Sequence, residues 1–105
     1  MLSKIPIDFS RTKKEGLNKE LLRAAMIAEL DAINLYEQMS DMTQNIDIRN
    51  LLLDVAREEK THVGEFQALL LREDKEQRNE LEEGKKEVEA LMRGSKKGEK
   101  ISKVR

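Results

Sequence analysis

The sequence contains no cysteine, one histidine and one proline, only 3% of its residues are aromatic, and it has no long apolar run. Without cysteine the chain forms no disulfide, performs no thiol catalysis and offers no thiolate to a metal, so a metal ion must bind through oxygen and nitrogen atoms. No stretch approaches the ~20 apolar residues that cross a bilayer, and the N-terminus does not have the pattern of a signal peptide. These absences predict a cytoplasmic protein without a membrane partner.

Charge is abundant but balanced, because 20 basic and 21 acidic residues leave a formal net charge of −1. A balance of this kind gives no field strong enough to indicate nucleic acid as a partner. Charged residues make up 39% of the 105 residues. This composition is typical of amphipathic helices, and so short a chain buries little apolar surface alone. We therefore expect an all-α protein that associates with itself.

Four segments follow from the pattern of apolar and polar residues. Residues 1–17 include Pro6 and are expected to form an extended arm, whereas residues 18–72 have the apolar spacing of helices. Residues 73–93 predict a shorter, mostly solvated helix with sparse apolar positions. Residues 94–105 carry five basic groups and one acid without a helical pattern, which predicts a disordered tail.

The segment 18–72 is expected to form a hairpin of two helices. The first helix is predicted from Asn18 to about Thr43, and the second is predicted to be capped by Asn45 and to end near Arg72. So short a connection makes the helices antiparallel neighbours. The fold class predicted is thus an antiparallel two-helix hairpin plus a C-terminal helix, with a break expected at Gly84.

Acidic residues interrupt the apolar row of each hairpin helix. Glu29 stands in the first helix among apolar residues spaced by three and four, and Glu59 and His62 stand three apart in the second. The second row consists of Leu52, Val55, Glu59, His62, Phe66 and Leu69. Burial of an unpaired carboxylate is costly, whereas a metal ion compensates for it. These positions therefore predict a metal site.

The spacing predicts that the three side chains meet at one level of the hairpin. Glu29 lies 16 residues before Asn45, while Glu59 and His62 lie 14 and 17 residues after it. At about 1.5 Å per residue, antiparallel packing brings all three to nearly the same height. One hairpin then supplies half of a di-iron site of four carboxylates and two histidines. A homodimer is the smallest unit that completes such a site.

The segments AELDAINLY and REEKTH, in which Glu59 stands 30 positions after Glu29, resemble the encapsulated ferritins, which are half-length members of the ferritin-like proteins. The resemblance covers about residues 18–75. It implies that Glu29, Glu59 and His62 are iron ligands and that Tyr36 is a phenol beside the site. It also implies a ferritin-like four-helix bundle formed by two subunits, and a ring of dimers that is often a decamer.

The resemblance extends less fully to the surroundings of the site. Asp31 matches an acidic position that the family uses in a secondary carboxylate site through which iron enters, so it is a further candidate metal ligand. Ala28 and Leu35 depart from the acid and the aromatic residue of some relatives. Many relatives end in a short apolar peptide that docks inside an encapsulin shell, and residues 94–105 are not a clear version of it.

The sequence thus predicts a ferroxidase that oxidises Fe(II) with O2 for iron storage or detoxification, either free in the cytoplasm or as cargo of an encapsulin nanocompartment. Carboxylates with imidazole suit iron, and manganese, zinc or calcium can substitute. One alternative is a peroxide-reducing protein of the rubrerythrin type, although no cysteine-ligated electron-transfer domain is present. The other is a helical scaffold in which the three residues form a buried polar network and Tyr36 is a core residue.

Overall fold

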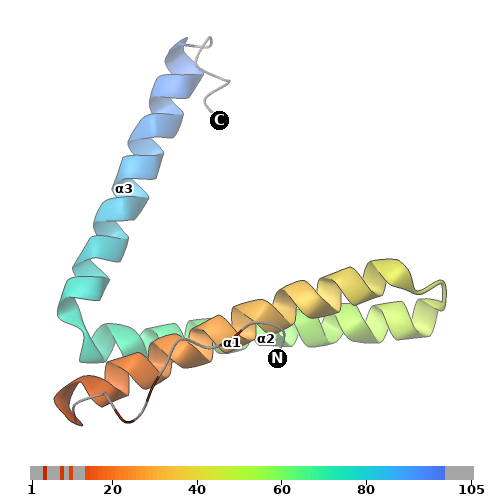
Figure 1. The fold of residues 1–105 in the computed structure, drawn as a ribbon. Coiled ribbons are helices and arrows are strands. Elements are labelled where there is room, and N and C mark those ends of the chain that lie inside the picture. Colours follow the sequence, from red (N-terminus) through yellow and green to blue (C-terminus); the bar gives the residue numbers. More distant parts are fainter. Residues whose placement is uncertain (1–3, 5–7, 9, 11–13, 99–105) are drawn as a thin grey trace. The chain divides into compact units, whose positions relative to one another are not determined.

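The computed structural model describes residues 4, 8, 10 and 14–98, and it consists of helices and their connections. The three helices are α1 (Lys14–Met42), α2 (Ile46–Glu73) and α3 (Lys75–Gly98) (Figure 1). They divide between two compact units, of which one contains α1 and α2 and the other contains α3. The predicted all-α fold, a helical hairpin followed by a C-terminal helix, is confirmed. Within the described residues, no helix is long and apolar enough to cross a membrane.

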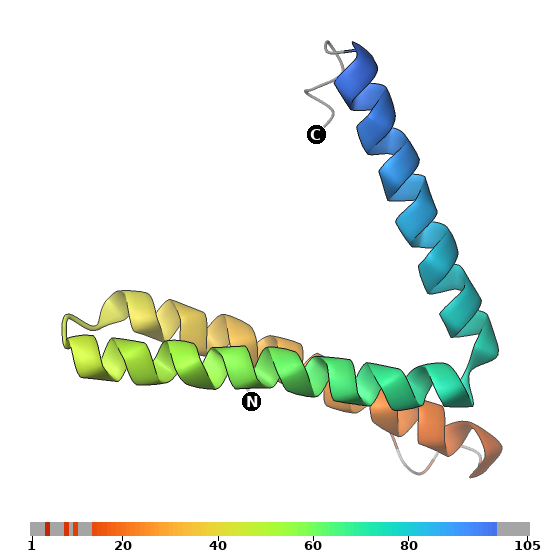
Figure 2. The same cartoon turned by 180° about the vertical axis from the view of Figure 1, so that it is seen from behind.

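Helices α1 and α2 lie antiparallel and side by side, joined by the turn at residues 43–45 (Figure 2). The side-chain oxygen of Asn45 accepts hydrogen bonds from the backbone N–H groups of Asp47 and Ile48, at 2.9 and 3.0 Å. These bonds satisfy donors that the first turn of a helix leaves without partners. The prediction that Asn45 caps the second helix is confirmed.

Arg49 holds the other side of the turn. Its Nε donates to the carbonyl oxygen of Ser40 at 3.2 Å, and its Nη2 donates to the carbonyl oxygen of Thr43 at 3.0 Å. Carbonyl groups at a helix C-terminus have no partner within the helix, so a guanidinium here satisfies them and also interacts well with the helix dipole. The first turn of α2 therefore stabilises the last turn of α1.

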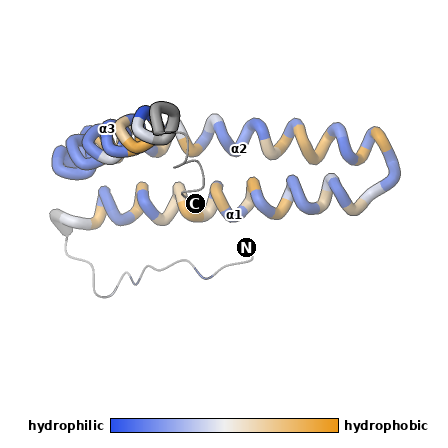
Figure 3. Tube along the Cα trace, turned by 90° about the horizontal axis from the view of Figure 1, so that it is seen from above, coloured by the Kyte–Doolittle hydropathy of each residue, from blue (hydrophilic) through white to orange (hydrophobic). Residues whose placement is uncertain are grey.

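The hairpin core is small. Its buried side chains are Ile33, Ser40, Ala56 and Leu70, with exposed fractions of 8%, 2%, 1% and 3%. Much apolar surface stays in contact with water on the same two helices, and Figure 3 shows hydrophobic residues recurring along both of them. Soluble monomers seldom expose this many large apolar side chains, so the hairpin surface has the character of an interface.

The helix boundaries differ from those expected. Helix α1 begins at Lys14, within the segment predicted as an arm, and it contains Gly16. Lys and Glu are good helix formers, and one glycine costs only ~1 kcal/mol, so the helix extends by a turn before Asn18. Most of the predicted arm lies outside the described residues.

Helix α3 is longer than expected and is not broken at Gly84. Asp74 caps it, since its Oδ1 accepts a hydrogen bond from the N–H of Gln77 at 3.0 Å. Neighbours with high helix propensity outweigh the glycine, and the helix continues to Gly98, beyond the predicted end at residue 93. The predicted disorder at residues 99–105 lies outside the described residues.

Candidate metal centre

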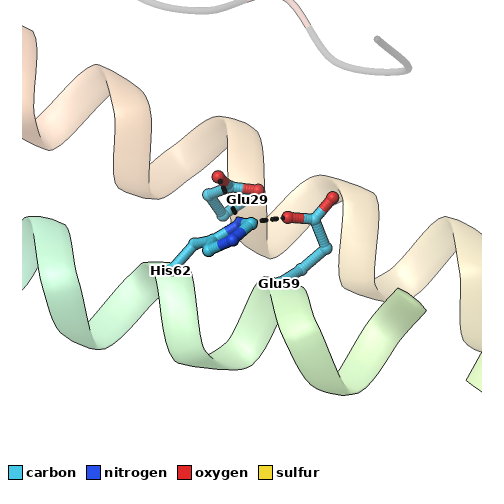
Figure 4. A group of neighbouring side chains, drawn as sticks. All are labelled: Glu29, Glu59 and His62. Atoms are coloured by element: carbon cyan, nitrogen blue, oxygen red, sulfur yellow. Dashed lines mark hydrogen bonds and ion pairs between the residues drawn. The ribbon is translucent and has the colours of Figure 1, made fainter. Parts of the chain in front are cut away.

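Glu29, Glu59 and His62 converge between the two hairpin helices (Figure 4). Glu29 comes from α1 and the other two from successive turns of α2, and one ligand atom from each lies within 4.8 Å of the others. The Nδ1 atom of His62 is 2.8 Å from Oε1 of Glu59 and 3.3 Å from Oε2 of Glu29. The expectation that the three side chains meet at one level is confirmed. Their role as metal ligands stays a prediction.

The cluster lies at the edge of the hairpin core, because Glu59 follows the fully buried Ala56 by three positions and so lies one turn further along a similar face. The side chains of Glu29 and Glu59 are 19% and 18% exposed, and that of His62 is 45% exposed. A single chain therefore shields the carboxylates from most of the solvent but leaves the imidazole half open.

The protonation of the three groups is linked. The hydrogen bond between the two carboxyl groups raises the pKa of Glu29 and lowers the pKa of Glu59, so Glu29 takes up a proton at a higher pH than Glu59 does. The hydrogen bond to Glu59 raises the pKa of His62. Glu29 and His62 therefore hold protons more tightly than free side chains do, which offsets part of the negative charge that the fold brings together. A cation binding here would take their place.

The donor set fits a hard to intermediate divalent cation. Two carboxylates and one imidazole are the ligand types that suit Fe(II), Mn(II) and Zn(II), and thiolate-preferring ions have no donor in this chain. A single chain supplies three such residues. Three ligands leave positions of a four- to six-coordinate ion open, so the arrangement can hold a metal but does not enclose it.

The other two predicted site residues lie on α1 outside this cluster. Tyr36 is half-buried two turns beyond Glu29, on the same side of the helix. Asp31 is also half-buried, but two positions from Glu29 place it on a different side of the helix. Across the part of the chain that the structure describes, Glu29, Glu59 and His62 are the only group of three or more potential ligands close enough to hold an ion.

One contact beside the cluster was not predicted. Lys60, which follows Glu59, forms an ion pair with Glu37 of α1 at 2.9 Å between Nζ and Oε2. The sequence signal was weak, because Lys and Glu are frequent throughout the chain. The pair links the two helices near the level of the site.

The protein family of this chain follows from its similarity to known proteins. The rubrerythrin family profile matches residues 20–105. A match over most of the chain shows that the protein belongs to the rubrerythrin family of ferritin-like proteins. Members of this family generally bind a di-iron centre, which agrees with the carboxylate and histidine cluster.

More specific relatives confirm the resemblance to encapsulated ferritins. The chain is 57% identical, over 94 residues, to a ferritin-like-encapsulin shell fusion protein of Pyrococcus furiosus, covering 87% of this chain and 27% of the relative. It is 36% identical, over 74 residues, to the encapsulin nanocompartment cargo protein EncC of Myxococcus xanthus, covering 70% of this chain and 57% of that protein. The chain therefore spans less than two thirds of either relative.

The fold agrees with a solved structure of the same kind. The crystal structure of the encapsulated ferritin domain from Pyrococcus furiosus superimposes with a TM-score of 0.74 at 53% sequence identity. The match covers 87% of this chain and 95% of that domain. The three-helix architecture is therefore that of an encapsulated ferritin domain.

Proposed function

We propose that this protein is a ferroxidase, which binds Fe(II) in a di-iron site shared by two copies of the chain and oxidises it to Fe(III) with O2. The observation that supports this best is the convergence of Glu29, Glu59 and His62 at a half-open position. Two iron ions need at least six protein ligands in the di-iron bundles, and one chain supplies three. A second copy related by a twofold axis supplies the other three.

The position of the cluster along the hairpin favours such a dimer. Glu29 lies near the middle of α1, and Glu59 lies near the middle of α2. A twofold axis through the cluster and perpendicular to the helices therefore overlaps two hairpins along their full length. The result is a four-helix bundle with the turn of one hairpin beside the open end of the other.

The apolar surface of the hairpin is suited to this overlap. A groove of about 350 Å³ near the turn is lined by Met39, Met42, Thr43, Ile48 and Leu52. A second groove of about 260 Å³ near the open end is lined by Asn18, Leu21, Leu22, Leu69 and Glu73. The perpendicular twofold axis brings the first groove of one copy towards the second groove of its partner, where both lose contact with water.

The charge of the dimeric site suits the proposed reaction. Two copies of Glu29 and Glu59 supply four negative charges when ionised, which balance two Fe(II) ions. Carboxylate ligands stabilise Fe(III) over Fe(II) and so favour the loss of one electron from each ion. Two electrons, one from each Fe(II), and two protons from solvent convert one O2 to hydrogen peroxide. The protons that Glu29 and His62 hold without metal are released when these side chains bind iron.

Two residues receive supporting roles in this proposal. Tyr36 contributes a phenol beside the site, where its hydroxyl can orient a ligand carboxylate or a water molecule. Asp31 contributes to a secondary carboxylate site that attracts Fe(II) before it reaches the centre. Manganese, zinc or calcium can occupy the same donors without the redox step.

We also propose that the protein acts as cargo of an encapsulin shell in the cytoplasm, and that its dimers form a ring, with a decamer as the expected size. The support comes from relatives, one named as a fusion with an encapsulin shell and the other as an encapsulin cargo protein. Enclosure would retain the oxidised iron that the ferroxidase releases, as iron storage or detoxification requires.

The test is an anaerobic Fe(II) titration followed by exposure to air, with native mass measured in parallel. We expect two iron ions per dimer and oxidation much faster than in protein-free buffer. The variants Glu59→Ala and His62→Ala should lose both the iron binding and the fast oxidation. Glu58→Ala removes the exposed acid next to Glu59 and should retain both properties. One iron or fewer per dimer, or oxidation at the rate of buffer, would contradict the ferroxidase proposal.

The same experiment addresses the alternatives. The family profile is that of rubrerythrin, so hydrogen peroxide is the second oxidant to compare. Faster turnover with peroxide than with O2 would favour a peroxide-reducing protein. Absence of metal binding with an unchanged oligomer would favour a helical scaffold, in which the cluster is a polar network.

A further inference from the structure

Helix α3 carries an apolar stripe that the proposed iron site does not use. Leu81, Val88, Leu91 and Met92 are 41%, 54%, 52% and 61% exposed. Apart from this stripe the helix is hydrophilic over most of its length (Figure 3). Four large apolar side chains on one side of a highly charged helix indicate a surface that binds another helix.

The spacing of the stripe is that of a coiled coil. Leu81 and Val88 are seven residues apart, and Leu91 follows Val88 by three, which places Leu81 and Val88 at a positions and Leu91 at a d position of a heptad repeat. Gly84 takes the other d position, and the space around its Cα is open. A glycine there adds no apolar contact, but it lets two helix backbones approach closely.

The charged residues that flank the stripe distinguish between possible partners. Glu80 and Glu87 take the g positions, and Lys85 takes an e position. In a parallel coiled coil a g residue meets the e residue five positions later in the partner, so Glu80 of each helix meets Lys85 of the other. An antiparallel pair instead brings g beside g and e beside e, which places Glu87 against Glu87 and Lys85 against Lys85.

We propose that α3 pairs with the α3 of a second copy of this chain, parallel and in register, through Leu81, Val88 and Leu91. The charge pattern carries this choice, since the parallel arrangement makes two attractive contacts between Glu80 and Lys85 and the antiparallel arrangement makes like-charge contacts. The remaining charges of α3, at positions such as Glu82 and Lys86, face solvent in this pair.

The pairing forms a second self-association surface, independent of the metal centre. Two heptads with one glycine in the apolar seam associate weakly on their own, because short helices bury little surface. Chains already held in one assembly experience a high effective concentration, under which a weak contact is populated. Because the α3 contact and the hairpin contact use different surfaces, each chain can join two others, which extends an assembly beyond a dimer.

Charge exchange in the full-length chain tests the proposal. Lys85→Glu replaces two attractive contacts with two repulsive ones, and we expect association beyond the dimer to weaken roughly tenfold in sedimentation velocity. The double variant Glu80→Lys/Lys85→Glu should recover the assembly. The matched control Lys86→Glu makes the same charge change at the adjacent, outward position and should assemble as the wild type does. Equal effects of Lys85→Glu and Lys86→Glu, or no recovery in the double variant, would overturn the pairing.

The absence of cysteine permits a direct test of register and direction. In a parallel pair Val88 lies opposite Val88, so the Val88→Cys variant should form a disulfide-linked dimer under mild oxidation, while Glu89→Cys on the outer side should not. Cross-linking of a Gly84→Cys chain to a Val88→Cys chain in preference to either alone would indicate the antiparallel pair. No cross-link at Val88 would indicate that another surface covers the stripe. Either result overturns the proposal, and neither depends on metal binding.

Discussion

The hairpin and α3 are both rich in acidic residues, yet among the residues that the structure describes only those of the hairpin form a cluster of potential ligands. Helix α3 contains six glutamates between Glu76 and Glu89, and none of them belongs to a group that could hold an ion. Glu29 and Glu59 do, because two helices bring them together beside a histidine. The number of acidic residues in a helix therefore does not indicate a metal site. A candidate site requires that acidic side chains from two helices converge.

The two regions also differ in how they use apolar residues. The hairpin buries Ile33, Ala56 and Leu70, and in doing so it holds Glu29 and Glu59 largely away from solvent. The described part of α3 has no buried side chain, and its charges remain solvated. A carboxylate that loses water needs a proton or a cation, whereas one that keeps its water needs neither.

The largest expected effect is on the rate of Fe(II) oxidation, and a pair of glutamate substitutions, one in the hairpin and one in α3, tests it. Glu59→Gln should lower the rate of Fe(II) oxidation by roughly 100-fold or more, because it removes a ligand from each half of a symmetric site. Glu82→Gln in α3 should leave the rate unchanged. Stopped-flow absorbance of ferric iron gives both rates. Equal rates in the two variants would remove the distinction between the regions.

The second prediction concerns the pH dependence of metal binding. Because the pKa values of Glu29 and His62 are raised, protons compete with a metal at these groups, and the affinity for Co(II) should fall as pH falls through the raised pKa of His62. The expected slope is roughly tenfold per pH unit for each proton displaced. Calorimetric titrations in buffers of different ionisation enthalpy measure the protons released. Affinity that rises at lower pH would contradict the linkage.

A smaller effect is expected at the turn of the hairpin. Arg49→Ala removes two hydrogen bonds to the carbonyls of Ser40 and Thr43, and we expect a loss of about 1 kcal/mol in the free energy of unfolding. Arg93→Ala on α3 serves as the control and should change stability little. Urea denaturation followed by circular dichroism compares them. An equal loss in Arg93→Ala would show that the effect is not specific to the turn contacts, and no loss in Arg49→Ala would contradict their stabilising role.

The smallest effect is expected at the ion pair between Lys60 and Glu37. Both side chains are about half exposed, at 59% and 46%, so the coupling between them should be below ~0.5 kcal/mol. A double-mutant cycle with Lys60→Ala and Glu37→Ala measures it in the same assay. A coupling free energy this small would mean that the ion pair contributes as little to stability as the solvated charges of α3 do. A coupling above ~1 kcal/mol would indicate that the pair fixes the register of the helices.

The sequence predicted the geometry of the cluster because that geometry follows from helix periodicity. Equal rise along two antiparallel helices brings Glu29 level with Glu59, and Asn45 caps α2 through contacts within four residues. The reach of Arg49 back to Ser40 could not be predicted, since it depends on how the turn folds. The predicted start of the first helix at Asn18 was also wrong, as was the predicted break at Gly84. Helix starts depend on small differences in propensity, and good helix formers on both sides of Gly84 outweigh one glycine.

The three converging ligands of one hairpin have a genetic consequence if two copies share the centre. Every substitution at Glu29, Glu59 or His62 is then present twice in the same centre, once from each chain. In a cell that makes equal amounts of normal and variant chains, about a quarter of the pairs formed at random would contain two normal copies. Loss of a ligand would therefore be dominant, and it would reduce activity more than a simple loss of half the protein.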